Sequence, residues 1–265
     1  MLKLIAQNKY KLMAFIIGLY LLVDVLQHKG LTRVLLPKKN PVFTNNAKFQ
    51  ETHFLINKDK NWVKGVNSLE RMRDKLSKNK GGMECDVYFD TAKKIFDVHH
   101  DIDNSTGLDL ETLLQEYQRL NLRASIWLDF KNLNDFTAVP ALNKLMQLRE
   151  KYRLQNKILV ESGRANLLNK YNENEFYTSY YVPVFNPYLL DNRSLVFYTD
   201  SIYKEIRNSS VNALSGYYFQ YSFLAKNFHG YDILLWAPDD RFSLVNWLFK
   251  KKIANDRDAY IVLYP

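Results

Sequence analysis

The stretch Gly81–Asp90 reads GGMECDVYFD, and the chain continues through Phe96–Asp101 as FDVHHD. Glu84 and Asp86 are two positions apart in an otherwise apolar segment. On a β-strand, side chains two positions apart lie on the same face, so both carboxylates can reach one point. Their like charges repel unless a cation lies between them, and Mg²⁺ and Ca²⁺ take such oxygen ligands. The stretch therefore predicts a strand with a divalent metal site.

Strand-like and helix-like segments alternate on both sides of this stretch, which is typical of a parallel α/β barrel. The expected strands are 61–66, 82–89, 94–99 (a ribbon paired with its predecessor), 124–130, 157–161, 176–185, 194–199, 213–219, 233–236 and 259–263, and the expected helices are 68–78, 110–120, 140–151 and 165–171. A (β/α)₈ barrel takes about 250 residues, or somewhat fewer when trimmed. We therefore expect residues 58–265 to form one compact TIM-type barrel.

The first thirty residues have the features of a leader. Lys3, Lys9 and Lys11 precede the apolar run 12–23, with no acid among residues 1–11. A basic flank before an apolar run indicates a secretory signal or a signal anchor, with the lysines in the cytoplasm. The absence of an Ala-x-Ala site favours an uncleaved N-terminal anchor helix over residues 1–29, followed by a linker over 30–57. A cleaved signal peptide and a buried amphipathic helix are the alternatives.

Composition limits the classes of function. Aromatic residues make up 14% and apolar residues 47% of the 265 residues, which is enough for a sizeable core and argues against disorder. The formal net charge is +9, but the basic residues are scattered, so we expect no nucleic-acid partner. Basicity also suits contact with anionic lipid headgroups. With the lysines of the leader in the cytoplasm, we expect the barrel outside it, in the periplasm or at the cell surface.

The order of motifs resembles one known superfamily. Glu-x-Asp-Val, a short ribbon and His-Asp are similar to the core of the glycerophosphodiester phosphodiesterases and phospholipase-C-like TIM barrels, and more closely to the menorin-type branch and its bacterial relatives. The resemblance spans roughly residues 58–265 and includes VNSLE at 66–70, LDLETLL at 108–114, WLDFK at 127–131, LLW at 234–236 and the segment 256–263.

The resemblance implies a site at the carboxyl ends of the strands, where TIM barrels carry their catalytic groups. It implies Glu84, Asp86 and Asp129 as ligands of Mg²⁺ or Ca²⁺, and Lys131 as a point charge for a phosphate oxygen. A further carboxylate, Glu161, lies near another strand end. Alternatively, these acids form a polar rim of the barrel with ordinary salt bridges to lysines.

The resemblance also implies a histidine acid or base and a substrate pocket. His100 matches the family histidine, and His99 is the alternative if the ribbon is counted differently. Trp236 is expected over the site, where core packing explains it equally well. Arg164 can bind a phosphate through two N–H groups of its guanidinium, or it can be a surface residue at the start of a helix.

One position departs from the family pattern. Members generally carry a second histidine at the end of the first strand, where this chain has Lys64. A desolvated lysine can act as a base, but neighbouring carboxylates raise its pKa. The expected function is metal-assisted cleavage of a phosphodiester, of lipid-derived headgroup type, at the cell envelope. The alternative is a catalytically degenerate barrel that binds a ligand or protein there, so Lys64 leaves open whether the chain is an active phosphoric diester hydrolase or lyase.

Overall fold

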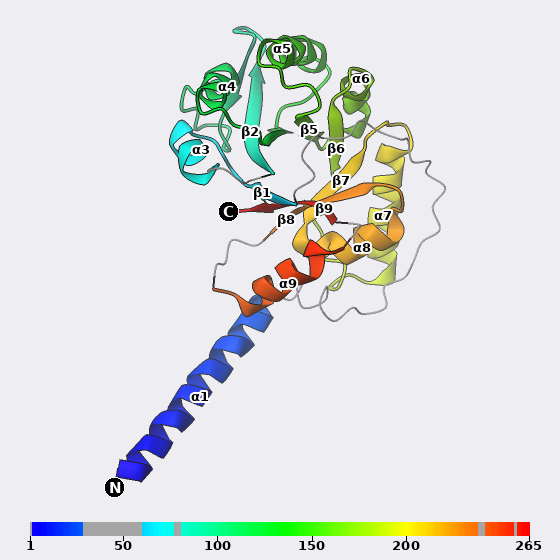
Figure 1. Ribbon diagram of the computed structural model, residues 1–265. Coiled ribbons are helices and arrows are strands. Elements are labelled where there is room, and N and C mark those ends of the chain that lie inside the picture. Colours follow the sequence, from blue (N-terminus) through cyan, green and yellow to red (C-terminus); the bar gives the residue numbers. More distant parts are fainter. Residues whose placement is uncertain (1, 29–59, 77–80, 238–241, 257–258) are drawn as a thin grey trace.

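The computed structural model describes residues 2–28, 60–76, 81–237, 242–256 and 259–265, so the expected linker, residues 30–57, lies outside the described part. The first element is helix α1, Leu2–Gln27, which projects from the side of the molecule (Figure 1). Its segment Asn8–Gln27 is 20 residues long with a mean hydropathy of 1.6, which is long and apolar enough to cross a membrane. A signal sequence near an N-terminus has the same length and composition.

Eight parallel strands close into a barrel within the described residues. They are β1 (Asn61–Val63), β2 (Gly82–Asp90), β4 (Ser125–Phe130), β5 (Ile158–Ser162), β6 (Tyr177–Tyr181), β7 (Ala213–Tyr217), β8 (Asp232–Trp236) and β9 (Ala259–Tyr264). β1 pairs with both β2 and β9, which closes the ring. β3 (Ile95–Val98) runs antiparallel to β2 as the expected ribbon. The TIM-type barrel predicted from the sequence is thus confirmed.

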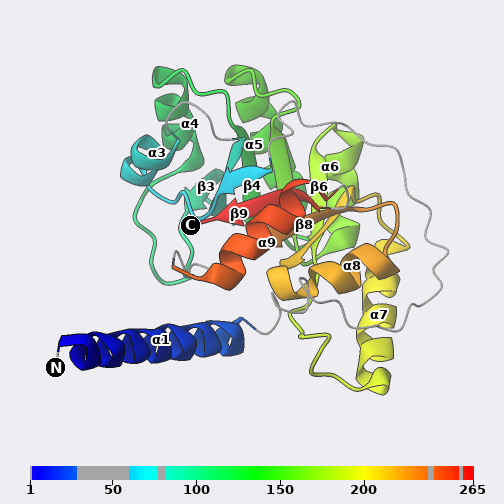
Figure 2. The same ribbon diagram turned by 60° about the horizontal axis from the view of Figure 1, so that its bottom comes forward.

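Helices surround the strands, as Figures 1 and 2 show. They are α3 (Leu69–Lys75), α4 (Leu110–Arg119), α5 (Ala138–Lys151), η1 (Ala165–Leu168), α6 (Asn169–Glu173), α7 (Asn192–Ile206), η2 (Tyr218–Gln220), α8 (Tyr221–Asn227) and α9 (Leu244–Ala254). Several begin at a side-chain cap: Ser68 Oγ accepts from Arg71 N at 3.1 Å, and Asp109 Oδ1 accepts from Thr112 N at 2.8 Å. Such caps satisfy backbone N–H groups that the first helical turn leaves unpaired.

One predicted strand is wrong. The segment 194–199 lies inside helix α7. Its β-branched and aromatic residues favour a strand by propensity, but Leu195, Thr199, Ile202 and Ile206 are buried at helical spacing, and Asp191 Oδ1 accepts from Ser194 N at 2.8 Å as the N-cap. The cap and the long apolar stripe therefore outweigh the local propensity.

Aromatic side chains fill the barrel interior below the site. Trp127 packs against Trp62 with ring centroids 6.4 Å apart and against Trp236 at 5.5 Å. Gly82 makes room for this cluster, since a Cβ there would lie 2.3 Å from the Trp62 ring. Alternation along β4 then places Asp129 on the same inner face as Trp127, two residues closer to the strand's carboxyl end. The apolar floor thus supports a polar layer at the mouth.

Candidate active site

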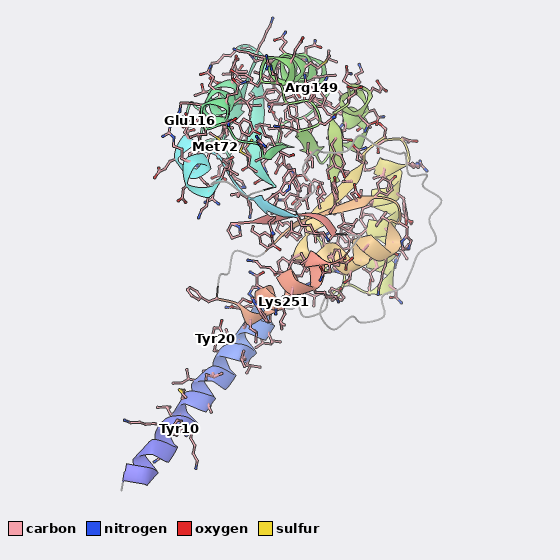
Figure 3. All side chains as sticks on the ribbon, in the orientation of Figure 1. Tyr10, Tyr20, Met72, Glu116, Arg149 and Lys251 are labelled. Carbon is pink, nitrogen blue, oxygen red and sulfur yellow. The ribbon has the colours of Figure 1, made fainter. Side chains whose placement is uncertain are left out.

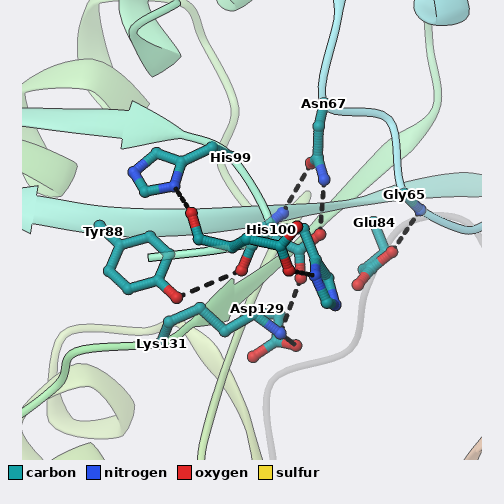
Figure 4. Close-up of polar contacts among 10 residues, drawn as sticks. Gly65, Asn67, Glu84, Tyr88, His99, His100, Asp129 and Lys131 are labelled. Atoms are coloured by element: carbon teal, nitrogen blue, oxygen red, sulfur yellow. Dashed lines mark hydrogen bonds and ion pairs between the residues drawn. The ribbon is translucent and has the colours of Figure 1, made fainter. Parts of the chain in front are cut away.

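Three buried carboxylates meet at the mouth of the barrel (Figure 4). Glu84 and Asp86 come from β2 and Asp129 from β4, and the register pairs Asp86 directly with Asp129. One oxygen of each carboxylate lies within 4.8 Å of the others, and all three side chains are almost completely buried. The structure therefore brings together the three acids that the family resemblance singled out.

The loop after β1 orients two of these carboxylates. Gly65 N donates to Glu84 Oε2 from a backbone with φ of +65°, a left-handed conformation that glycine adopts without strain. Asn67 contacts Asp86 twice: its Nδ2 donates to Oδ2 at 2.6 Å, and its Oδ1 accepts from Asp86 N at 2.9 Å. The sequence analysis did not assign Asn67 to the site. The sequence holds one sign of this role. Two residues that can cap a helix, Asn67 and Ser68, precede α3, and only Ser68 caps it, so the side chain of Asn67 can contact the site instead.

Lys131 lies between two of the acids. Its Nζ is 2.7 Å from Asp86 Oδ1 and forms a second ion pair with Asp129 Oδ2. Burial lowers the pKa of Lys131, but the two carboxylates raise it above its usual value, so the ammonium stays charged. The side chain is about one quarter exposed and reaches the pocket. Lys131 therefore supplies a fixed positive charge at the mouth.

The acid cluster holds three carboxyl groups beside a single cation, Lys131. Burial, followed by the charges of Asp86 and Asp129, raises the pKa of Glu84 to about 8, against the opposing effects of the Gly65 hydrogen bond and Lys131. Burial also raises the pKa of Asp129, against the opposing effect of Lys131. Three converging carboxyl groups match the oxygen-ligand preference of Mg²⁺ or Ca²⁺, whose charge would favour their ionised forms. The residues present therefore fit a hard divalent cation.

A pocket of about 370 Å³ opens over the cluster. Its lining comprises Lys64, Gly65, Asn67, Glu84, Asp86, His100, Asp129, Lys131, Tyr181, Tyr217 and Trp236. Trp236 packs edge-on against Tyr181 at 5.0 Å and near Tyr217 at 5.8 Å, so three aromatic rings form one wall. The sequence analysis expected Trp236 here and missed the two tyrosines, whose signal is their place at the carboxyl ends of β6 and β7.

The two histidines lie in different surroundings. His100 lines the pocket, its side chain is exposed, and its Nδ1 is 2.8 Å from Asp101 Oδ1. His99 is buried, stacks on Tyr88 at 4.4 Å, and has Nε2 3.4 Å from Asp97 Oδ2. The ribbon thus presents His100 to the pocket and keeps His99 in a packed cluster behind it.

The other two expected residues lie apart from the pocket lining. Glu161 pairs in register with Asp129 and is fully buried, and burial together with the charge of Asp129 raises its pKa well above the usual value. It is not part of the cluster of three acids. Arg164 is exposed immediately before η1 and does not line the pocket.

Comparisons with known proteins agree with this geometry. Residues 59–176 match the family model of the menorin N-terminal domain. A solved glycerophosphodiester phosphodiesterase from Parabacteroides distasonis is 14% identical with a TM-score of 0.54, covering 78% of this chain and 93% of that one. A protein from Silicibacter pomeroyi described as a glycerophosphoryl diester phosphodiesterase is 13% identical with a TM-score of 0.57, covering 80% and 92%.

A third solved structure, described as a glycerophosphodiester phosphodiesterase from Galdieria sulphuraria, is 14% identical with a TM-score of 0.55 and covers 77% of this chain and 93% of that one. No curated protein matches the chain. At these identities, the likeness to solved structures establishes a shared fold. Together with the domain match, it confirms the resemblance seen in the sequence.

Proposed function

We propose that this TIM-barrel chain cleaves a phosphodiester with the help of a divalent cation. It matches the menorin N-terminal domain over residues 59–176 and shares its fold with the glycerophosphodiester phosphodiesterases. The observation that carries the proposal is the convergence of Glu84, Asp86 and Asp129 beneath a pocket that also holds Lys131 and His100.

Each group has a distinct task in this proposal. Glu84, Asp86 and Asp129 would hold the cation, which would polarise a phosphoryl oxygen. The attacking group is a hydroxyl, either of water or of the substrate itself, which forms the new P–O bond and releases its proton to solvent as the bond to the leaving oxygen breaks. Lys131 stabilises negative charge on the phosphoryl oxygens, because its ammonium is fixed at the pocket floor. His100 donates a proton to the leaving oxygen, since its imidazole lines the pocket and histidine is the side chain most often used as a general acid.

The aromatic wall and Lys64 complete the pocket. Trp236, Tyr181 and Tyr217 exclude water from one side and offer a surface for a headgroup. Lys64 also lines the pocket and adds positive charge for a phosphate. Glu161, the register partner of Asp129, stays a candidate for a further metal ligand, and Arg164 stays a candidate for phosphate binding.

We further propose that residues 1–29 anchor the protein in a membrane, that 30–57 form a linker, and that the barrel of residues 58–265 acts outside the cytoplasm. The apolar helix α1 and its lysines support this arrangement. A phosphodiester from lipid headgroups is then the nearest substrate.

The second candidate function is a barrel that binds a ligand without cleaving it. Lys64 favours it, because it stands where family members generally carry a histidine. Without that histidine, a mechanism with two histidines as acid and base cannot operate in the usual way. In this reading the acid cluster and aromatic wall recognise a headgroup or a partner protein.

The test is calorimetric titration of Mg²⁺ and of Ca²⁺ into the full-length protein, beside the double variant Glu84→Gln/Asp86→Asn. Asp103→Asn, at an exposed carboxylate outside the pocket lining, is the matched control. The same samples are then screened for hydrolysis of glycerophosphodiesters. Binding that is lost only in the double variant, with turnover, supports the enzyme, and binding without turnover supports the second candidate. Absence of metal binding in the native chain contradicts the metal-assisted enzyme and leaves a barrel whose role is recognition.

A further inference from the structure

Helix α9 carries apolar side chains on two faces. Val245, Phe249 and Ile253 are buried against the barrel, as expected for its inner face. On the outer side, Leu244, Trp247 and Leu248 are 43%, 49% and 38% exposed at i, i+3 and i+4 spacing, and Phe242 just before the helix is 86% exposed. We call these four residues the α9 stripe. A surface helix in water normally presents polar residues on its outer face, so the α9 stripe is an exposed apolar patch of the kind that marks a protein or membrane contact.

Helix α1 ends beside the α9 stripe. The Asp24 carboxylate is buried, and its Oδ2 accepts a hydrogen bond from Val245 N in the first turn of α9 at 3.0 Å. Tyr20 Oη donates to the carbonyl oxygen of Phe242. Tyr20 on α1 and Lys251 on α9 lie on either side of this junction (Figure 3), and both ribbon views place the end of α1 next to α9 (Figures 1 and 2). The membrane candidate and the α9 stripe therefore adjoin.

Positive charge borders the α9 stripe. A pocket of about 540 Å³ lies between α9 and strands β1 and β9, and its lining includes Lys60, Lys250 and Lys251 but no acid among the described residues. Lys251 Nζ lies 4.0 Å from the centre of the Trp247 ring, which joins the basic pocket to the α9 stripe. Tryptophan beside lysine is the combination found where proteins meet the headgroup region of a bilayer.

We propose that the α9 stripe lies in the interfacial region of the bilayer that α1 crosses, with the adjoining lysines against anionic phospholipid headgroups. The inference rests on the proposed membrane anchoring and adds a second, peripheral contact that fixes the orientation of the barrel. Because α9 follows β8, its first turn lies at the carboxyl end of the strands, the same end as the carboxylate cluster. The contact thus holds the pocket close to a lipid surface, which selects phosphodiesters that reside in or leave that surface.

The distribution of tryptophans allows a direct test. Of the four tryptophans, Trp62, Trp127 and Trp236 are at most 6% exposed in the barrel, and α1 contains none. Full-length protein is reconstituted into phosphatidylcholine–phosphatidylglycerol vesicles with and without brominated acyl chains, which quench tryptophan at the interface. If the four emit equally, the native chain should lose up to about a quarter of its emission, and Trp247→Phe should lose none.

Two controls separate the α9 stripe from general adsorption. Phe197 is 66% exposed on α7, which lies away from α1 in both ribbon views, so Trp247→Phe/Phe197→Trp should show no quenching. Replacing phosphatidylglycerol by phosphatidylcholine should reduce the Trp247 quenching, as should Lys250→Gln/Lys251→Gln. Equal quenching with and without Trp247, equal quenching of a tryptophan at 197, or failure of the chain to float with vesicles would overturn the inference. The readout needs neither metal nor turnover, so failure of the proposed catalysis leaves it intact.

Discussion

The ionised carboxylate of Glu84 suits a metal ligand but lowers the free energy of unfolding when no metal is bound. Its pKa is about 8 in the folded barrel and near 4.5 in an unfolded chain, so between these values the folded state holds more protons. Stability then falls as the pH rises from about 4.5 to 8. We expect Glu84→Gln to raise the free energy of unfolding at pH 8 by on the order of 2 kcal/mol, and much less at pH 5, because one pKa unit corresponds to about 1.4 kcal/mol. Thermal unfolding in EDTA at the two pH values measures this, and a loss of stability at both would contradict it.

Lys131 holds two buried acids together. Lys131→Met leaves Asp86 and Asp129 without their common cation, and removing one partner of a buried ion pair costs about 3–5 kcal/mol. We expect a loss near the lower figure at pH 8, which millimolar Mg²⁺ partly reverses by replacing the lost charge. Denaturant unfolding with and without Mg²⁺ measures both effects. Lys151→Met is the control, because Lys151 pairs with Glu111 at the surface and its loss should change stability far less than the loss of Lys131.

At the scale of residues, strand alternation was enough to predict that Glu84 and Asp86 share a face, because parity along a strand fixes which side chains do so. Asp129 lies on another strand and was assigned to the site from the family resemblance. Asn67 could not be found this way, since its contact with Asp86 depends on how the loop after β1 turns. The choice between His99 and His100 depended on the register of the β2–β3 ribbon, which pairs Val98 with Val87 and leaves both histidines beyond the last pair.

At the scale of elements, the contact between β1 and β2 depends on a glycine, Gly82, which has no side chain to collide with Trp62. Gly82→Ala places a methyl group 2.3 Å from the buried Trp62 ring, so ring or backbone must move. Overpacking of this kind costs about 1–3 kcal/mol. Gly163→Ala is the matched control, because a Cβ there meets nothing within 4 Å and its φ is not positive. Urea unfolding of the two variants should differ by at least about 1 kcal/mol, and equal stabilities would refute the packing argument.

Helices α3 and α4 are joined by one carboxylate. Glu116 Oε1 accepts from Arg73 Nε at 2.6 Å and Glu116 Oε2 from Arg119 Nε at 2.6 Å, and these hydrogen bonds lower the pKa of Glu116 to about 2. A carboxylate with a lowered pKa stabilises the fold above its unfolded pKa near 4.5 and loses this effect as the pH falls towards 2. Glu116→Gln should therefore be less stable than the native chain at pH 7, and the gap should close by pH 2. Parallel unfolding curves across this range measure the gap, and a constant gap would contradict the assignment.

Most elements were predicted within a few residues, because caps such as Ser68 and Asp109 and buried runs such as Ile126–Phe130 mark boundaries locally. α7, α8 and α9 were missed. In α7, the run Leu195–Tyr198 has strand propensity, and the helical stripe appears only over the full length of Asn192–Ile206. β6 proved shorter than the tyrosine-rich segment 176–185, because only Tyr177–Tyr181 finds partners on both β5 and β7.

At the scale of the whole molecule, Asp24 links the N-terminal helix to the barrel. Asp24→Ala removes the acceptor for Val245 N, and losing such a cap typically costs about 1 kcal/mol. Hydrogen exchange of the Val245 amide in the full-length protein should speed up roughly fivefold. Asp191→Ala, which removes the cap of α7, should leave that amide unchanged. The sequence predicted an apolar leader and a barrel, but a contact across 221 residues has no local signature, so the junction itself could not be foreseen.

Pairing of β1 with β9 means that the first and last barrel strands are direct neighbours. During synthesis, β2 to β8 can emerge and pair in order, yet the growing sheet keeps two unsatisfied edges until β9 is available. Open edges are templates for pairing with other chains, and contacts between distant segments form slowly. The barrel can therefore close only after almost all of the chain has been made, and until then the two open edges can pair with other chains.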